Sequence, residues 1–260
     1  MRIDFHTHGK LGKKLPFCPE YMAWHLNQAM ESGLDAIAMT EHYNGTDIEK
    51  VFDFLGVNPI GDAFTRDNGL QLFIGLEIDA KEGGHFLTIG HIQDMRDLYQ
   101  KLKPYVAKKE HPTFKELVSL VGNYPVLFGA AHPFRPSNPI NYLQPQDMGA
   151  LQFLELNGKD CAMDPGNEAA VRALAAQYNL PVIAGSDTHQ SNQFGCIATH
   201  FTRKITTIHG LMDAIKDGAY SIDFGEQLTN QVATAKLIKA ALKAIHKLGG
   251  DYVSVVLDTV

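Results

Sequence analysis

The sequence is poor in cysteine, in net basic charge and in long apolar runs, and each shortage excludes a class of protein. Its three cysteines, Cys18, Cys161 and Cys196, are far apart and odd in number, so they predict no disulfide framework and a reducing compartment, the cytoplasm. The 23 Lys and Arg residues against 29 Asp and Glu residues leave a net charge of −6, so no overall basic field attracts nucleic acid or a lipid surface. No stretch approaches the roughly 20 apolar residues of a membrane span. The opening segment Met1–Asp4 carries charges where a signal peptide would be apolar.

What the sequence contains is a globular composition and a regular alternation of strand and helix patterns. Hydrophobic residues make up 45% and charged residues 20% of the chain, which excludes a disordered or fibrous protein. Strand-like runs lie at Arg2–Thr7, Ala36–Thr40, Leu70–Ile78, Phe86–Gly90, Val126–Ala131, Leu151–Leu156, Pro181–Gly185 and Ala219–Ile222. Stretches of helical period separate them, which predicts parallel βα units in an open sheet or a closed barrel. With no repeat and no linker-like stretch, we expect a single domain over residues 1–260, with a C-terminal helix at about 229–248.

The 12 histidines are the most informative feature, because several stand at the ends of predicted strands. In the segment from Asp4 to His8, alternation along a strand predicts that Asp4, His6 and His8 share one face, where two imidazoles can grip one metal ion. Four further strand ends carry acidic or imidazole side chains, at Glu41-His42, Glu77 followed by His85, His132, and Asp187-Thr188-His189. Parallel α/β folds carry their chemistry at the C-terminal ends of strands. Imidazole and carboxylate ligands suit Zn, Mn, Fe or Ni, so we expect a metal site there.

Taken in order, these segments resemble the PHP (polymerase and histidinol phosphatase) family of metal-dependent phosphoesterases. The matching segments are Asp4-Phe5-His6-Thr7-His8, Thr40-Glu41-His42-Tyr43-Asn44, Gly75-Leu76-Glu77, His85, Ala131-His132-Pro133-Phe134-Arg135, Leu154-Glu155-Leu156-Asn157 and Gly185-Ser186-Asp187-Thr188-His189. The resemblance implies a distorted seven-stranded (β/α) barrel, similar to a TIM barrel, with two or three divalent metal ions at its C-terminal mouth. It also implies hydrolysis of a phosphate ester by a metal-bound hydroxide, with no protein nucleophile.

The resemblance further implies which residues hold the ions. The implied ligands are His6, His8, Glu77 and Asp187 for one ion, His85 and His132 with a bridging Glu77 for a second, and His42 and His189 for a third.

The chain departs from the family pattern at the third ion. Lys13 and Lys14 stand where another ligand is usual, and ammonium groups cannot coordinate a metal. Glu20 or His25 are the alternatives for completing that site. Glu41 stands where the family usually has Asp, and we interpret it as orienting an imidazole.

Arg135 is the candidate phosphate-binding residue, because a guanidinium matches phosphate oxygens with two parallel hydrogen bonds. The alternative for Arg135 is a surface arginine paired with a carboxylate. Lys10, Lys13 and Lys14, in the loop after the first motif, could contact phosphate or stand in for the third cation. The charge balance favours a small substrate and argues against a long nucleic acid, which would need a basic stripe. A phosphorylated metabolite, a nucleotide and a short oligonucleotide stay open as substrates of a phosphatase or phosphodiesterase. No membrane partner is expected.

Two other functions stay open at this point. An amidohydrolase-type metallohydrolase also carries His-x-His on its first barrel strand and a late Asp, but no lysine stands at a strand end here to bridge two metals. A degenerate PHP scaffold would bind metal or partners without turnover, and the loss of a ligand from the first motif points toward it. The retained ligand-type residues favour the phosphoesterase, with Zn, Mn or Fe as the expected ions.

Overall fold

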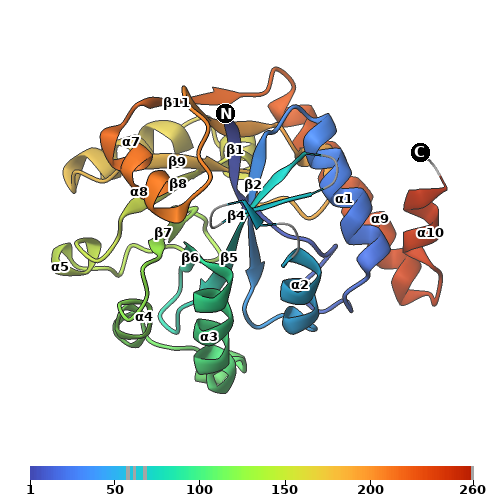
Figure 1. The fold of residues 1–260 in the computed structure, drawn as a ribbon, viewed down its shortest axis with the longest axis horizontal. Coiled ribbons are helices and arrows are strands. Elements are labelled where there is room, and N and C mark those ends of the chain that lie inside the picture. The colour runs from blue at the N-terminus through green and yellow to red at the C-terminus, as the bar shows by residue number, and fades with distance from the viewer. Residues whose placement is uncertain (57–58, 61–62, 67–68, 259–260) are drawn as a thin grey trace.

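The computed structural model describes residues 1–56, 59–60, 63–66 and 69–258, and its strands form one mixed sheet that curls into a nearly closed barrel (Figure 1). The barrel wall consists of β1 (Arg2–Thr7), β2 (Ala36–His42), β5 (Gln71–Asp79), β6 (His85–Gly90), β7 (Leu127–Ala131), β8 (Phe153–Asn157) and β9 (Val182–Gly185). The barrel closes where the segment after β9 meets β1. There the His8 N–H donates to the Thr188 carbonyl, and the Asp187 N–H donates to the His6 carbonyl. The predicted TIM-barrel-like α/β fold class is confirmed.

The alternation of strands and helices predicts a parallel sheet. The observed sheet is not parallel throughout. β6 runs antiparallel to both β5 and β7, because only a short turn joins β5 to β6, whereas a parallel crossover needs a dozen or more residues. Gly83 and Gly84 make this turn with φ angles of 118° and 78°, which residues with a Cβ rarely adopt.

Four short strands extend the sheet beyond the wall. β10 (Ile197–Phe201) pairs antiparallel with β1, and β11 (Tyr220–Phe224) pairs antiparallel with β10. β4 (Ala63–Thr65) pairs antiparallel with β5, and β3 (Pro59–Ile60) pairs with β4.

Helices surround the barrel (Figure 1). They are α1 (Pro19–Glu31), α2 (Ile48–Leu55), α3 (Ile92–Leu102), α4 (Phe114–Val121), α5 (Pro145–Met148), α6 (Gly158–Met163), α7 (Asn167–Gln177), α8 (Ile208–Asp217), α9 (Leu228–Lys247) and α10 (Tyr252–Leu257), with the 3-10 turns η1 (Lys103–Tyr105), η2 (Lys108–Glu110) and η3 (Ser191–Gln193). α9 lies where the sequence predicts the C-terminal helix, and α9 and α10 pack beside α1 (Figure 1). Among the described helices, none combines the length and the apolarity needed to cross a membrane.

Two apolar layers fix the orientation of the strand ends. Inside the barrel, side chains such as Phe5, Phe73 and Phe153 pack together with the apolar face of α8. Outside the wall, side chains such as Ile37 and Leu76 pack against the surrounding helices. Alternate residues of a strand face opposite sides. A polar residue that follows an inner apolar residue by an even number of positions therefore lies on the same side, facing the barrel mouth.

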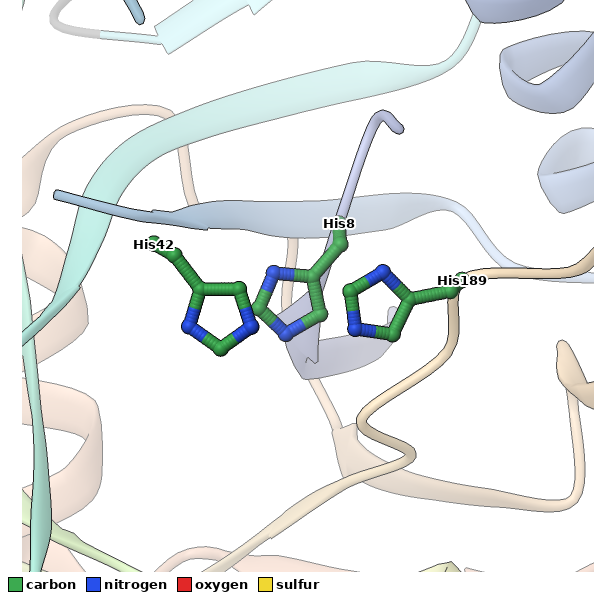
Figure 2. A group of neighbouring side chains, drawn as sticks. All are labelled: His8, His42 and His189. Atoms are coloured by element: carbon green, nitrogen blue, oxygen red, sulfur yellow. The ribbon is translucent and has the colours of Figure 1, made fainter. Parts of the chain in front are cut away.

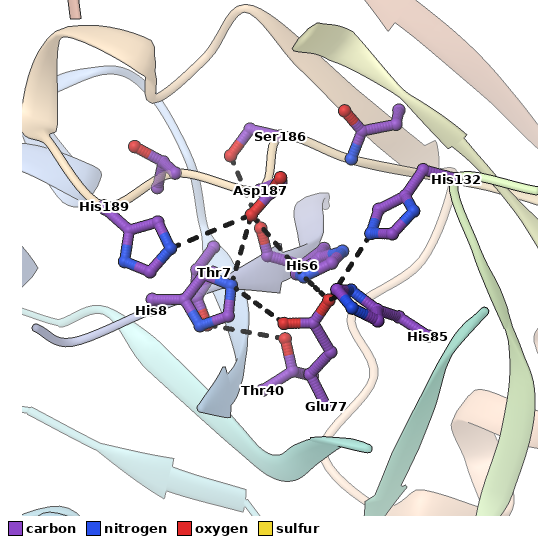
Figure 3. A network of polar contacts seen from close by, with 12 residues as sticks. His6, Thr7, His8, Thr40, Glu77, His85, His132, Ser186, Asp187 and His189 are labelled. Atoms are coloured by element: carbon purple, nitrogen blue, oxygen red, sulfur yellow. Dashed lines mark hydrogen bonds and ion pairs between the residues drawn. The ribbon is translucent and has the colours of Figure 1, made fainter. Parts of the chain in front are cut away.

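β1 breaks this alternation by a β-bulge. Between Asp4 and Thr7, three steps along β1 match two steps along β2, so β1 contains one extra residue. Asp4 pairs with Ile37 of the outer layer, whereas His6 and His8 point into the mouth (Figure 3). The prediction that Asp4 shares one face with both histidines is therefore corrected, because the bulge returns His6 to the inner side.

Candidate metal centre

Glu77, near the C-terminal end of β5, lies at the centre of a cluster of imidazoles (Figure 3). Its carboxylate oxygens lie 3.5 Å from His6 Nε2, 3.4 Å from His8 Nε2, 2.7 Å from His42 Nδ1, 2.5 Å from His85 Nδ1 and 3.4 Å from His132 Nε2. Burial opposes ionisation of Glu77, but the neighbouring His42 and His85 outweigh it and hold the pKa of Glu77 well below its usual range. The barrel mouth therefore keeps a buried negative charge at the point where strands β1, β2, β5 and β6 meet.

Asp187, just after β9, supplies a second carboxylate to the same cluster. Its Oδ1 lies 3.2 Å from His8 Nε2 and 3.9 Å from His6 Nε2. The backbone of Asp187 has φ 55° and that of His132 has φ 31°, which are uncommon for residues other than glycine. Such backbone conformations are concentrated at functional sites, where the surrounding structure holds them in place.

His8, His42 and His189 form a stack of three rings (Figure 2). The ring centroids are 4.4 Å apart for His8 and His42, and 4.0 Å apart for His8 and His189. His189 Nδ1 lies 2.8 Å from the Lys10 carbonyl oxygen, so its N–H donates there and leaves Nε2 as the free ligand atom. His42 and His189, the two residues implied for a third ion, thus come together, and His8 joins them.

The atoms that face the centre of the cluster fit divalent metal ions. The buried atoms without a hydrogen-bond partner include His6 Nε2, His8 Nε2, His42 Nδ1 and Glu77 Oε2. His42 Nδ1 and Glu77 Oε2 are close in space yet form no hydrogen bond. Leaving such atoms unpartnered in a buried site costs free energy, and a cation would satisfy several of them at once. Imidazole nitrogen and carboxylate oxygen are donors suited to Zn, Mn or Fe.

Four groups of three ligand-type side chains, among the residues that the structure describes, bring their ligand atoms within 4.8 Å of one another. The groups are His6, His8 and Asp187; Glu77, His85 and His132; His8, His42 and His189; and His6, His132 and Glu155. All eight residues implied as ligands therefore fall into this one cluster. How the ions divide these side chains between them stays a prediction.

Glu155 bonds two of the histidine residues, and Glu41 lies beside a third. Glu155 Oε1 lies 2.9 Å from His6 Nδ1, and Glu155 Oε2 accepts a hydrogen bond from the His132 backbone N–H. Glu41 Oε1 lies 3.5 Å from His8 Nδ1 without forming a hydrogen bond to it, so the orienting role of Glu41 stays a prediction. A side chain at Gly185 would collide with the Glu155 carboxylate and with His6, so this position requires glycine.

Arg135 is enclosed by protein partners. Its Nε donates to Asp160, its Nη1 lies 2.6 Å from Asp187 Oδ2, and its Nη2 donates to Asn157 Oδ1. Burial lowers the pKa of Arg135, but the carboxylates of Asp187 and Asp160 outweigh burial and raise it. The structure thus gives Arg135 the carboxylate partners of the alternative interpretation, in a buried position instead of at the surface. Phosphate binding by Arg135 stays a prediction.

Lys13 reaches the edge of the cluster through a residue that the sequence analysis missed. Lys13 Nζ lies 3.0 Å from Asp79 Oδ2, and Asp79 Oδ1 lies 3.2 Å from His85 Nε2. Asp79 stands two residues after Glu77, so strand alternation was the signal that could have identified it. Lys14 contacts only the Asn44 carbonyl, at 3.5 Å, among the hydrogen bonds of the described chain.

The two residues considered for completing the third site lie elsewhere. Glu20 is exposed at the start of α1 and accepts a hydrogen bond from the Cys18 thiol. His25 is buried, and its ring centroid lies 4.5 Å from that of Phe194 in a tilted arrangement. Neither appears in the four ligand groups that the described residues form.

Comparison with known proteins supports the resemblance seen in the motifs. The family model described as PHP-associated matches residues 166–220, a segment that contains Asp187 and His189. A comparison with curated protein sequences gives no significant match.

Three solved structures share the fold. PsfC from Pseudomonas syringae is 20% identical with a TM-score of 0.74, covering 93% of this chain and 98% of PsfC. The lesion-specific endonuclease Q from Pyrococcus furiosus is 22% identical with a TM-score of 0.62, covering 85% of this chain and 57% of that enzyme. A candidate metal-dependent phosphoesterase from Bifidobacterium adolescentis is 15% identical with a TM-score of 0.52, covering 82% and 95% of the two chains.

Fold and site together define a TIM-barrel-like α/β protein with a buried histidine–carboxylate centre at the mouth of the barrel. The PHP-associated model thus matches one segment of the chain, and the three solved structures share its fold.

Proposed function

We propose that the protein hydrolyses the phosphate ester of a small phosphorylated molecule, using two or three divalent ions of Zn, Mn or Fe. The observation that carries this proposal is the buried Glu77 carboxylate among five imidazoles, several of whose inward atoms have no protein partner. His6, His8, Glu77 and Asp187 would hold one ion, His85 and His132 with Glu77 a second, and His42 and His189 a third. Bound divalent ions would lower the pKa of water toward neutrality and stabilise negative charge on phosphoryl oxygens.

The residues of the chain prepare the site for that chemistry. Glu155 accepts the Nδ1–H of His6, which leaves Nε2 facing the cluster. Arg135 holds the Asp187 carboxylate through a 2.6 Å contact. The apolar interior below the mouth, with Phe73 and Ile183 fully buried, excludes water from the barrel side of the site. Ligands fixed in this way need little rearrangement when ions and substrate bind.

The small substrate is proposed on the charge balance of the chain. Its Lys and Arg residues do not outnumber its Asp and Glu residues, whereas phosphate contacts along a nucleic acid require many basic side chains. One structural relative, endonuclease Q, is known as a complex with a 27-mer DNA duplex, so nucleic acid is the substrate to test against. This chain spans 57% of the Pyrococcus furiosus endonuclease Q. A cytoplasmic location is proposed from three free cysteines.

Hydrolysis of p-nitrophenyl phosphate with added Mn²⁺, Zn²⁺ or Fe²⁺ tests the proposal. We expect metal-dependent activity that a chelator removes and that Glu77→Gln lowers by about 100-fold or more, because the central anion is lost. Glu226→Gln, at an exposed glutamate, is the matched control and should keep full activity.

The same assay separates the alternative functions. Hydrolysis of amides without hydrolysis of phosphate esters would establish the amidohydrolase instead. Less than one ion per chain after reconstitution, with neither activity, would support the non-catalytic scaffold.

A further inference from the structure

A cavity of about 160 Å³ adjoins the candidate metal centre on the side covered by α9. Asp187 and His189 line it from the barrel, Lys159 from α6, and Lys236 and Lys239 from α9. At roughly 30 Å³ for each water molecule, the cavity holds about five non-hydrogen atoms. A phosphate group has that size.

The lining of this cavity carries more positive charge than its protein partners neutralise. Asp187 is its only carboxylate, and Asp187 Oδ2 already accepts a hydrogen bond from Arg135. Lys159 Nζ lies 3.5 Å from the same oxygen. Lys239 makes no hydrogen bond or ion pair with any part of the chain that the structure describes. Ammonium groups that gather without counter-charges favour binding of an anion.

The environment of Lys239 supports the same conclusion. Burial, together with the neighbouring Lys243 and Lys159, lowers the pKa of Lys239 to about 7, although Asp187 opposes the shift. An anion in the cavity would compensate for burial and for the repulsion between the lysines.

We propose that Lys159 and Lys239 bind the non-bridging oxygens of the substrate's phosphate group, beside the candidate metal centre. This inference rests on the proposed function and defines its substrate class as a terminal phosphate group. Arg135, the sequence candidate for phosphate binding, already donates to Asp160, Asp187 and Asn157, which leaves the lysines as the cations that face the cavity.

The test measures binding of inorganic phosphate to the Mn²⁺-reconstituted protein by isothermal titration calorimetry. We expect Lys239→Met and Lys159→Met each to weaken phosphate binding by about tenfold or more, since a charge-assisted hydrogen bond is lost. Lys239→Arg should restore most of the affinity. Lys247→Met, at an exposed position of the same helix, is the matched control and should bind phosphate as the wild type does. Bound metal, measured by elemental analysis, should be the same in all variants.

Phosphate affinity that is unchanged in both methionine variants would overturn the proposal, and so would a parallel loss of bound metal, which indicates a purely structural role. With p-nitrophenyl phosphate, Lys239→Met should raise KM more than it lowers kcat. If the wild type hydrolyses no phosphate ester yet binds phosphate through Lys239, the proposed function fails while the anion site stands. If Lys239→Met hydrolyses p-nitrophenyl phosphate normally with an unaltered KM, the proposed function stands while the anion site fails.

Discussion

Arg135 contacts three buried polar side chains at the barrel mouth. Its two candidate roles, phosphate binding and pairing with carboxylates, can therefore be separated by measuring stability as well as phosphate affinity. Its side chain is only 12% exposed, and its ion pairs with Asp160 and Asp187 are buried. Lys159, which also approaches Asp187, is 38% exposed and lies farther away at 3.5 Å. Removing Arg135 would therefore leave two buried carboxylates without their main cation.

We expect Arg135→Met to lower the free energy of unfolding by about 3–5 kcal/mol, the usual cost of breaking a buried ion pair. Lys159→Met should cost less than about 1 kcal/mol, as for a solvent-screened pair. Urea unfolding of the metal-free protein measures both values. An Arg135→Met protein that keeps its stability and loses only phosphate affinity would show that Arg135 binds phosphate directly.

His25 is a buried imidazole outside the ligand cluster, packed against Phe194 and Tyr21. Burial lowers the pKa of His25 to about 3. In the unfolded chain an ordinary histidine takes up its proton near pH 6.5. Between these values the unfolded state binds one more proton than the folded state, so stability falls as the pH is lowered.

His25→Phe should therefore reduce the acid sensitivity of the protein. Each pH unit between about 6.5 and 3 contributes about 1.4 kcal/mol to the difference. We expect the loss of unfolding free energy between pH 6.5 and pH 4.5 to be smaller in His25→Phe by roughly 2–3 kcal/mol. His209→Phe, at an exposed position, is the control. Equal pH slopes in wild type and His25→Phe would contradict the assignment.

At the scale of elements, α9 links the barrel mouth to the C-terminal end of the chain. Leu242 is 4% exposed and packs with Leu11, Tyr21, Tyr252 and Val256. These contacts hold α9 against α1 and α10, and α9 in turn places Lys239 at the cavity. The position of one site residue thus depends on an apolar cluster outside the barrel.

Leu242→Ala should lower the free energy of unfolding by about 2–5 kcal/mol through the lost contacts and the cavity that forms. Leu237, on the same helix, is 71% exposed, so Leu237→Ala should change stability by less than about 0.5 kcal/mol. Thermal unfolding followed by circular dichroism gives both values. Similar stabilities for the two variants would show that α9 is not held by this cluster.

At the scale of the whole molecule, bound ions would change the charge that the substrate meets. The formal net charge of −6 would become −2 with two divalent ions, and the added charge would be concentrated at the mouth. An acidic protein can therefore present a locally positive site to a phosphate group.

Divalent ions should also stabilise the folded protein. Ions at 100 times their dissociation constant add about 2.7 kcal/mol, which corresponds to roughly 5–10 °C in Tm for a chain of this size. We expect Mn²⁺ to raise the Tm of the wild type and a chelator to reverse the rise, as followed by differential scanning fluorimetry. Glu77→Gln should show little of this effect. An equal rise in Glu77→Gln would place the bound ions elsewhere.

The clustering of His6, Glu77, His132 and Asp187 could be predicted from local patterns, whereas those patterns allowed an open sheet or a barrel and only the family resemblance implied the barrel. In a barrel of parallel strands, the C-terminal ends of all the strands lie at one mouth, so acidic and imidazole residues at those ends come together. The direction of β6 was not predicted, because parallel and antiparallel pairing leave the same hydrophobic pattern in a short strand. Asp79 could have been found by the alternation that identified Glu77.

By itself, the sequence determined the order of strands and helices and the kinds of side chain at the strand ends, since alternation and helical period are properties of neighbouring residues. Only the tertiary structure decided which partners those side chains have. The β1 bulge that turns His6 inward depends on pairing with β2. The contact between Arg135 and Asp187 joins residues 52 positions apart, and Lys239 reaches the mouth only because α9 packs there. Such contacts depend on the packing of distant segments, which no local pattern records.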